Sequence, residues 1–377
     1  MVVSQSQPSQ NPTAEETPLI SADSHIFEPG NLWLERTARK FHDRVPKIVS
    51  VKEGDTWEYD GGQTMAFAGF ATAGDWKGRT SSFMRVEDLR PAIFDPIARM
   101  EEARLDGIRA EVLYPSFAMR LFGSEDPEFQ FEVMRAYNDW LIEYCSADPD
   151  RLLPHAMIPS LDVEAAIREV RRTAKLGFRG FLINAHPRLG RDYGTTLYEG
   201  LWSAIEESGL PASLHLYAGD TEPKRFDPLA IYSVDPGMIQ RSLALIVFTG
   251  VLERHPGLRL IVVESDVGWV AHLLTRMDHV FQRKGPRFGT ALKSGLLPSE
   301  LFKRQISCVL TEDRAGILTL EITGADIYMW GSDYPHNDST WPNSQRTVER
   351  VFSGVPQETR RAILAGNAAR LYGLDVD

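Results

Sequence analysis

Five side chains of the types that bind metal ions stand at or directly after short apolar runs of the sequence. They are Asp23, His25, His215, Glu264 and Asp333. Imidazole nitrogen together with carboxylate oxygen suits zinc, manganese, iron or cobalt rather than a metal that prefers thiolates. Such an ion lowers the pKa of bound water towards ~7 and polarises a substrate oxygen. The sequence therefore predicts a divalent-metal site, with zinc expected first.

Two further histidines could do chemistry beside this site. His186 follows the apolar run at residues 180–184, and His336 ends the segment Ser-Asp-Tyr-Pro-His. We interpret both, together with Asp333, as candidates for orienting a substrate or moving a proton. Each candidate also has an ordinary structural alternative. A lone histidine can pack at the rim of a core, Asp333 can cap a turn, and Glu264 can pair with an arginine.

The apolar runs that carry these residues are the expected strands. Eight runs, rich in Val, Ile, Leu and Tyr, fit short strands that are buried on both faces. Residues i and i+2 of a strand point to the same side, so Asp23 and His25 can face one site together. The runs cover residues 18–23, 107–114, 152–158, 180–184, 211–216, 258–264, 305–310 and 326–330.

Most of the runs are separated by amphipathic stretches, which predict helices. Residues 162–176 place apolar side chains on one stripe, with Asp162 as the amino-terminal cap and Gly177 as the stop. Eight strands alternating with helices predict an α/β fold, a distorted (β/α)8 TIM barrel whose functional residues come from the carboxyl ends of its strands. The other predicted helices cover residues 197–208, 236–253, 269–281 and 315–322.

Three segments lie outside this alternation. Residues 1–17 are polar, and we interpret them as a flexible amino-terminal arm, so that residues 18–377 form a single barrel domain. Residues 30–90 hold several glycines and aromatics and no clear helix. We expect this segment to be an insertion after the first strand that acts as a lid or an oligomer contact. The carboxyl end predicts two helices, at residues 344–352 and 356–372.

The overall composition excludes several classes of protein. The 377 residues include 41 Lys and Arg against 52 Asp and Glu, a net charge of −11, with no basic cluster. Nucleic acid and anionic membranes are therefore not expected as partners. No run reaches the ~18 apolar residues of a membrane helix, and the polar amino terminus is unlike a signal peptide. The two cysteines, Cys145 and Cys308, lie far apart, so we expect buried thiols and a cytoplasmic location.

These motifs together resemble the amidohydrolase superfamily. The resemblance rests on Asp-x-His at 23–25, on His215, on Gly-Ser-Asp-Tyr-Pro-His at 331–336 and on the ending Ile-Leu-Ala-Gly-Asn-Ala-Ala-Arg-Leu-Tyr-Gly at 363–373. It covers about residues 18–375 and is strongest to the amidohydrolase 2 group, related to aminocarboxymuconate semialdehyde decarboxylase. Members of this group are hydrolases, non-oxidative decarboxylases and hydratases, and a few relatives are metal-dependent oxygenases.

The resemblance implies a distorted barrel with one or two divalent metals, held by Asp23, His25, His215 and Asp333. The sequence departs from the family at two positions. The first ligand of the first strand is often His or Glu, and here it is Asp23. The decarboxylases place a histidine at the end of the sixth strand as a general acid, and here Glu264 stands in that segment. A carboxylate beside a cation is a poor proton donor, so Glu264 is expected as a ligand that could bridge two ions.

We predict a metal-dependent hydrolase or lyase that acts by hydrolysis or non-oxidative decarboxylation on a small organic acid or amide-like substrate. Two alternatives stay open. A mononuclear or dinuclear iron or manganese centre on the same ligands could support an oxygenase. The chain could also be a catalytically silent metal-binding subunit that partners an active homologue. A homodimer, or a pair with a homologous subunit, is the expected assembly.

Overall fold

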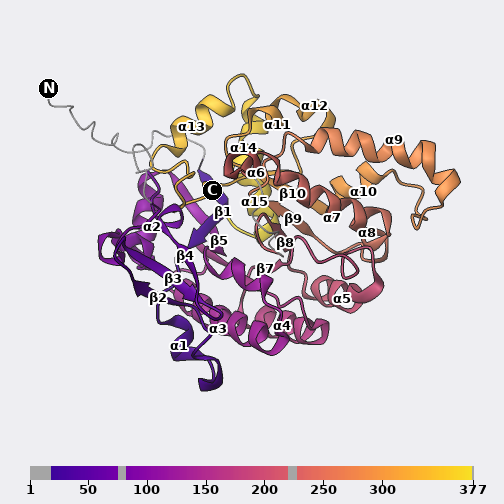
Figure 1. The fold of residues 1–377 in the computed structure, drawn as a ribbon. Coiled ribbons are helices and arrows are strands. Elements are labelled where there is room, and N and C mark those ends of the chain that lie inside the picture. Colours follow the sequence, from indigo (N-terminus) through magenta and orange to yellow (C-terminus); the bar gives the residue numbers. More distant parts are fainter. Residues whose placement is uncertain (1–17, 75–81, 220–226, 376–377) are drawn as a thin grey trace.

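Eight parallel strands form the centre of the molecule, and helices surround them (Figure 1). The computed structural model describes residues 18–74, 82–219 and 227–375, so the predicted arm at residues 1–17 lies outside the described residues. Each predicted apolar run forms one strand, and the predicted (β/α)8 fold is confirmed. The strands are β1 (Leu19–Ile26), β5 (Ile108–Pro115), β6 (Leu152–Met157), β7 (Gly180–Ile183), β8 (Ala212–His215), β9 (Leu260–Val263), β10 (Ile306–Leu310) and β11 (Tyr328–Trp330).

The barrel closes between its first and last strands. The strand order is β1-β5-β6-β7-β8-β9-β10-β11, which leaves β1 and β11 at the two ends of the sheet. Just beyond β11, Tyr334 forms a parallel bridge with Ser24. The His25 amide donates to the Tyr334 carbonyl at 2.6 Å, and the Asp333 amide donates to the Asp23 carbonyl at 2.9 Å. We call these contacts the seam; they bring Asp333 beside Asp23 and His25.

A buried arginine supports the seam. Arg99, in α2 (Pro96–Leu105), is fully buried and pairs with Glu111 of β5 at 2.9 Å. Its guanidinium also donates to the carbonyl of His25 at 2.6 Å and to that of Tyr334 at 3.4 Å. A buried charge is tolerated when it is paired and its donors are used. Arg99 therefore links β5 to both sides of the seam.

The helices fill the connections between the strands. As predicted, α4 is capped by Asp162 and ends at Gly177, whose φ is 96°. The prediction of one helix over 236–253 is wrong, because Gly250 adopts a φ of 77° and separates α7 from α8. No described helix is long and apolar enough to span a membrane. The remaining helices are α3 (Pro127–Cys145), α4 (Val163–Leu176), α5 (Glu199–Ser208), α6 (Pro228–Val234), α7 (Pro236–Phe248), α8 (Val251–Arg254), α9 (Val270–Phe288), α10 (Pro298–Gln305), α11 (Arg314–Leu318), α12 (Leu320–Thr323), α13 (Ser344–Val351), α14 (Gln357–Arg361) and α15 (Asn367–Tyr372).

The insertion after β1 forms a small antiparallel sheet of β2 (Lys47–Ser50), β3 (Asp55–Tyr59) and β4 (Gln63–Ala66). The expectation of no clear helix here misses the five-residue α1 (Leu32–Arg36). Aromatic side chains attach the sheet to the barrel. Trp57 stacks on Phe117 with ring centroids 4.6 Å apart, and Phe27 contacts Phe67 edge-on at 5.1 Å. Because Phe27 and Phe117 follow β1 and β5, the insertion lies beside the carboxyl ends of these strands.

Candidate metal centre

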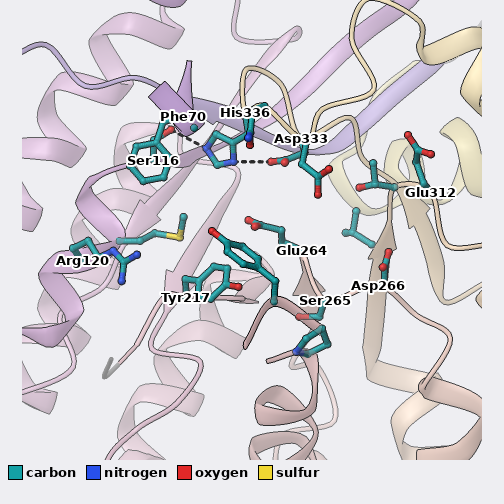
Figure 2. A pocket seen from close by; sticks show the side chains of 18 of the residues that line it. Phe70, Ser116, Arg120, Tyr217, Glu264, Ser265, Asp266, Glu312, Asp333 and His336 are labelled. Atoms are coloured by element: carbon teal, nitrogen blue, oxygen red, sulfur yellow. Dashed lines mark hydrogen bonds and ion pairs between the residues drawn. The ribbon is translucent and has the colours of Figure 1, made fainter. Parts of the chain in front are cut away.

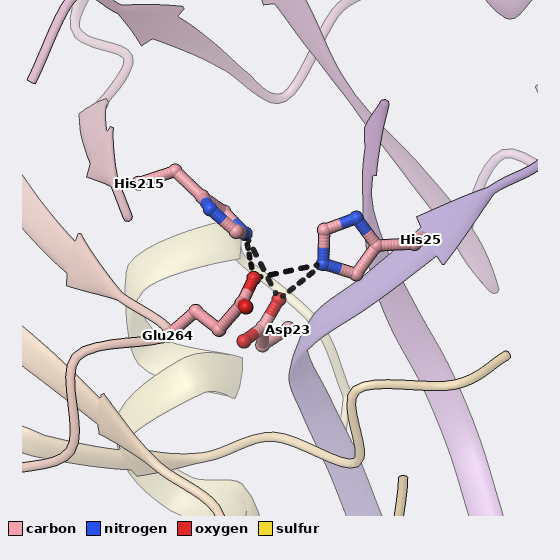
Figure 3. Close-up of side chains that lie close together, drawn as sticks. All are labelled: Asp23, His25, His215 and Glu264. Carbon is pink, nitrogen blue, oxygen red and sulfur yellow. Dashed lines mark ion pairs between the residues drawn. The ribbon is translucent and has the colours of Figure 1, made fainter. Parts of the chain in front are cut away.

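The five predicted metal ligands converge at the carboxyl ends of four strands. Asp23 and His25 lie in β1 and His215 ends β8, while Glu264 directly follows β9 and Asp333 lies shortly after β11. In Figure 3 the side chains of the first four of these point toward one another. Their spatial convergence fits the predicted site, and their role as ligands stays a prediction.

The spacing of the ligand atoms fits a single small cation. His25 Nε2 lies 3.5 Å from Asp23 Oδ1, 3.5 Å from Glu264 Oε2 and 3.3 Å from Asp333 Oδ1. His215 Nε2 lies 3.4 Å from both Asp23 Oδ1 and Glu264 Oε2. A tetrahedral ion with ligand bonds of about 2.0–2.1 Å separates its ligands by about 3.3–3.4 Å. The side chains therefore already stand at the separations that such an ion requires.

Backbone carbonyls fix which nitrogen each of the two buried histidines presents. Nδ1 of His25 lies 2.9 Å from the carbonyl of Pro115, and Nδ1 of His215 lies 2.8 Å from the carbonyl of Leu216. A carbonyl only accepts a hydrogen bond, so Nδ1 must carry the proton when the ring is neutral. Nε2 then presents its lone pair to the centre, which is the arrangement found around metal-bound histidines.

The converging atoms are buried and have no hydrogen-bond partner among the described residues. Leaving a buried polar atom unpaired costs about 1–3 kcal/mol. Burial disfavours a charged His25, but neighbouring carboxylates, Asp23 first among them, hold its pKa well above the usual value. The cluster therefore attracts positive charge, and a divalent cation fits it. The atoms are Asp23 Oδ1 and Oδ2, His25 Nε2, His215 Nε2, Glu264 Oε2 and Asp333 Oδ1.

His336 extends the cluster toward solvent. Its Nδ1 lies 3.0 Å from Asp333 Oδ1, and its Nε2 lies 3.2 Å from the hydroxyl of Ser116. Its ring stacks on that of His25 with centroids 3.8 Å apart. Burial alone would raise the pKa of Asp333, but His336 and His25 hold it well below its usual range. His336 thus lies beside the predicted ligands, and its catalytic role stays a prediction.

The cluster forms the floor of a cavity of about 570 Å³. Glu264, Asp333 and His336 line this cavity, whereas Asp23, His25 and His215 are fully buried. Aromatic and thioether side chains form part of the wall. In the view of Figure 2, Arg120 lies on the side opposite to Asp266 and Glu312. The apolar members of the wall are Met65, Phe70, Met119, Tyr217, Tyr232 and Val309.

Two lining residues that the sequence did not indicate come from the chain after β5. Ser116 contacts His336, and Arg120 is the one Lys or Arg that lines the cavity among the described residues. Applying the strand-end rule to β5 would have found Ser116, because it directly follows that strand. Arg120 lies four residues farther on, in a short 3₁₀ helix, where no periodic pattern indicates its direction.

The structure does not bring His186 to this site. It neither lines the cavity nor belongs to the groups of clustered metal-binding side chains. Strand β7 ends at Ile183, and the amide of His186 donates to Asn184 Oδ1 at 2.8 Å. Burial lowers the pKa of His186 to about 4. The position of His186 therefore gives no support to its predicted catalytic role.

Comparison with known proteins identifies the family of the chain. The family model described as Amidohydrolase matches residues 63–374. Gamma-resorcylate decarboxylase of Rhizobium sp. (strain MTP-10005) is 26% identical over 331 residues, covering 82% of this chain and 93% of that protein. 2-Amino-3-carboxymuconate-6-semialdehyde decarboxylase of Dictyostelium discoideum is 22% identical over 291 residues, covering 75% of this chain and 77% of that protein.

Among solved structures, the 5-carboxyvanillate decarboxylase of Novosphingobium aromaticivorans DSM 12444, complexed with manganese and 4-hydroxy-3-methoxy-5-nitrobenzoic acid, has a TM-score of 0.70 to this chain. The two sequences are 18% identical, and the match covers 98% of this chain and 100% of that structure. The barrel and the family match over most of the sequence confirm the resemblance that the motifs indicated. The chain belongs to the amidohydrolase family.

Proposed function

We propose that the protein is a divalent-metal-dependent decarboxylase that removes CO2 from a small aromatic acid without oxidation. The observation that carries this proposal is the set of preformed ligand separations at the floor of a cavity with aromatic walls. The related decarboxylases of aromatic acids support the reaction class. Asp23, His25, His215 and Glu264 would hold the ion, with Asp333 beside them.

The metal would be manganese as readily as zinc. The predicted set contains more carboxylates than histidines, and oxygen ligands favour manganese over softer ions. The related structure with bound manganese supports the same choice. When bound, the ion would neutralise anionic oxygens of the substrate and hold them at the cavity floor.

The side chains of the cavity can orient an aromatic acid. Arg120 has no ion-pair partner among the described residues and can donate to an anionic substituent. Phe70 and Tyr217 present rings to a planar substrate. When the carbon–carbon bond to the carboxylate breaks, the electron pair stays on the ring carbon, which then takes up one proton. Asp333 and His336 face the cavity, and the pair can hold a proton between Oδ1 and Nδ1.

The test is a decarboxylation assay under nitrogen. Protein loaded with manganese or zinc is incubated with gamma-resorcylate and a panel of other hydroxybenzoic acids, and CO2 and the arene are quantified together. We expect one CO2 for each arene formed, and no turnover by the chelator-treated protein. His215→Ala should lose metal and activity together, whereas the exposed His272→Ala should keep both.

Other results would support the alternatives. Substrate consumption that requires oxygen and gives a hydroxylated product would replace the decarboxylase with an oxygenase. Cleavage of amides or lactones without CO2 would indicate a hydrolase that uses metal-bound water. Turnover that appears only after a homologous chain is added would identify a silent subunit. A homodimer, or a pair with such a homologue, stays the predicted assembly.

A further inference from the structure

We infer that Glu28 is a positioning residue for the substrate, because its carboxylate holds the chain segment that carries Arg120 into the cavity. The inference rests on the proposed function, in which Arg120 binds an anionic substituent of the acid. Glu28 stands two residues after the end of β1, is fully buried and does not line the cavity. It can therefore act on a substrate only through the residues that it contacts.

Both oxygens of the Glu28 carboxylate accept hydrogen bonds from the main chain after β5. Oε2 accepts from the amide of Phe117 at 3.1 Å, and Oε1 accepts from that of Ala118 at 2.9 Å. These amides stand at the start of a short 3₁₀ helix, Ala118–Gly123, where an amide has no carbonyl of its own helix to donate to. Both residues are fully buried, so without Glu28 two main-chain donors would lack an acceptor, which is rare in native proteins.

The other end of this short helix is held by a second buried side chain. Gln130 of α3 is fully buried, and its Nε2 donates to the carbonyls of Leu121 and Phe122, both at 3.2 Å. A carboxylate thus accepts from the free amides at one end, and an amide group donates to the carbonyls at the other. The segment is therefore fixed from two sides, by the chain after β1 and by α3.

The segment held in this way forms one side of the cavity wall. Figure 2 shows Ser116 and Arg120 on the same side of the cavity. The amide of Arg120 donates to the carbonyl of Phe117 at 3.0 Å, which ties the main chain of Arg120 to a residue that Glu28 holds. A shift at the start of the short helix would therefore move Arg120 relative to the floor of the cavity. The side chains of the segment that line the cavity are Ser116, Met119 and Arg120.

The position of the segment then sets the affinity for the acid. Arg120 can bind an anionic group only in those molecules whose segment stands in the described position. When the fraction of such molecules falls, the apparent dissociation constant rises by the inverse of that fraction. A loss of the Glu28 contacts should therefore weaken substrate binding more than it slows the chemical step.

The competing role for Glu28 is general support of the fold, and a double-substitution experiment separates the two roles. Glu28→Gln keeps the size of the side chain and one of its two acceptor oxygens. We expect it to raise KM about 3- to 10-fold, with a smaller change in kcat, for the acid found in the decarboxylation assay. Added to Arg120→Gln, the same substitution should change KM by less than about twofold, because the side chain that it positions is gone. General support of the fold would instead multiply the two effects.

Controls accompany this experiment. Asp162→Asn alters another carboxylate that caps a helix, but Asp162 does not line the cavity, so KM should stay unchanged. Circular dichroism would confirm that each variant is folded. Glu28→Asp keeps the charge but is one methylene shorter. It should show the same pattern as Glu28→Gln and serves as the second variant should Glu28→Gln not fold.

Hydrogen exchange measured by mass spectrometry tests the contact without any substrate. Residues 116–124 should take up deuterium faster in Glu28→Gln than in the wild type, with the barrel strands unchanged. Unchanged exchange there, or an equal effect on KM with and without Arg120, would refute the positioning role and leave the proposed decarboxylase standing. Absence of turnover by the wild type would overturn the proposed function, and with it the role of Glu28 in binding the acid. Faster exchange would even then uphold the contact between Glu28 and the segment.

Discussion

The histidines of the centre are oriented by the main chain rather than by other side chains. His25 and His215 each have Nδ1 against a backbone carbonyl, those of Pro115 and Leu216. A side-chain carboxylate in either position could be removed by a single substitution. The two carbonyls are main-chain groups, one in strand β5 and the other directly after β8, so a substitution leaves them in place. The orientation of the His25 ring is therefore set by the neighbouring strand β5, and that of the His215 ring by the residue that follows it in the chain.

We expect Arg120 to select the substrate by binding its anionic group. Replacing Arg120 with Gln removes a charge-assisted hydrogen bond, worth about 1.5–3 kcal/mol, from the bound acid. We therefore expect KM to rise about 10- to 100-fold, with a smaller change in kcat. Steady-state kinetics on the substrate found in the decarboxylation assay measures this. Arg168→Gln, an exposed change on α4, serves as the control, and a loss confined to kcat would contradict the assignment.

At the level of single residues, the sequence indicated the side chains that converge better than it indicated the wall of the cavity. Asp23 and His25 could be indicated because side chains alternate along a strand, so residues two apart face the same side. Glu264 could be indicated because the functional residues of such a barrel stand at the carboxyl ends of its strands. His186 stands three residues after the end of β7 at Ile183 and does not line the cavity, so its place after a strand was not enough to state where its side chain lies. Arg120 lies in an irregular segment, whose direction is set by packing that no local pattern encodes.

Among the elements, the seam depends on one buried ion pair, between Arg99 and Glu111. Arg99→Met leaves Glu111 as a buried, unpaired charge and removes the donors to His25 and Tyr334. Breaking a buried pair in this way costs about 3–5 kcal/mol. We expect a loss of that size in the free energy of unfolding, measured by urea titration. Arg104→Met, which breaks an ion pair whose side chains are both 56% exposed, should leave the free energy of unfolding nearly unchanged, because water screens exposed charges.

A second link between elements gives a pH dependence. Asp106, after α2, accepts from the amide of Ser344 at 3.0 Å and from its hydroxyl, which joins it to the start of α13. Burial raises the pKa of Asp106 from 3.8 to about 6. The folded protein therefore holds this proton more tightly than the unfolded chain. Lowering the pH from 7 through 6 towards 4 stabilises the wild type relative to Asp106→Asn, by up to about 3 kcal/mol.

Urea unfolding of the metal-free proteins at several pH values measures this difference. Between pH 7 and 8 the difference should be flat, because Asp106 is ionised in both the folded and the unfolded chain. Parallel curves for the two proteins from pH 7 to pH 4 would show that Asp106 does not titrate in this range.

The strands were predictable because each contains a short run rich in apolar residues, whereas helices α2 and α3 were missed. Helices α2 and α3 begin at Asp95-Pro96 and Asp126-Pro127, and in both the aspartate accepts from amides of the first turn. This cap-and-proline signature was present in the sequence and could have been read. The small sheet β2–β4 could not, since its short strands mix polar and apolar residues and are held by aromatic contacts with distant segments.

At the scale of the whole molecule, the proposed cation joins β1, β8, β9 and β11 across the barrel. Binding to the folded chain alone stabilises it by about 2.7 kcal/mol when the free ion is at 100 times its Kd. With about 2 cal/mol/K of unfolding entropy per residue, this corresponds to about 3 °C in Tm for a chain of this length. Chelation should lower the Tm by that amount in a calorimetric scan. His215→Ala should show no such shift, and an unchanged wild-type Tm would argue against tight binding.

The seam also has a consequence for how the protein is made. During translation, residue 333 is added to the chain about 300 residues after residue 23. At about 5–20 residues per second, the interval is roughly 15–60 s. During that time β1 can pair with β5, but its other edge has no partner and Asp333 has not yet been synthesised. The five predicted ligands can therefore come together only after residue 333 has been synthesised, so the proposed cation can meet all of them only after translation has passed β11.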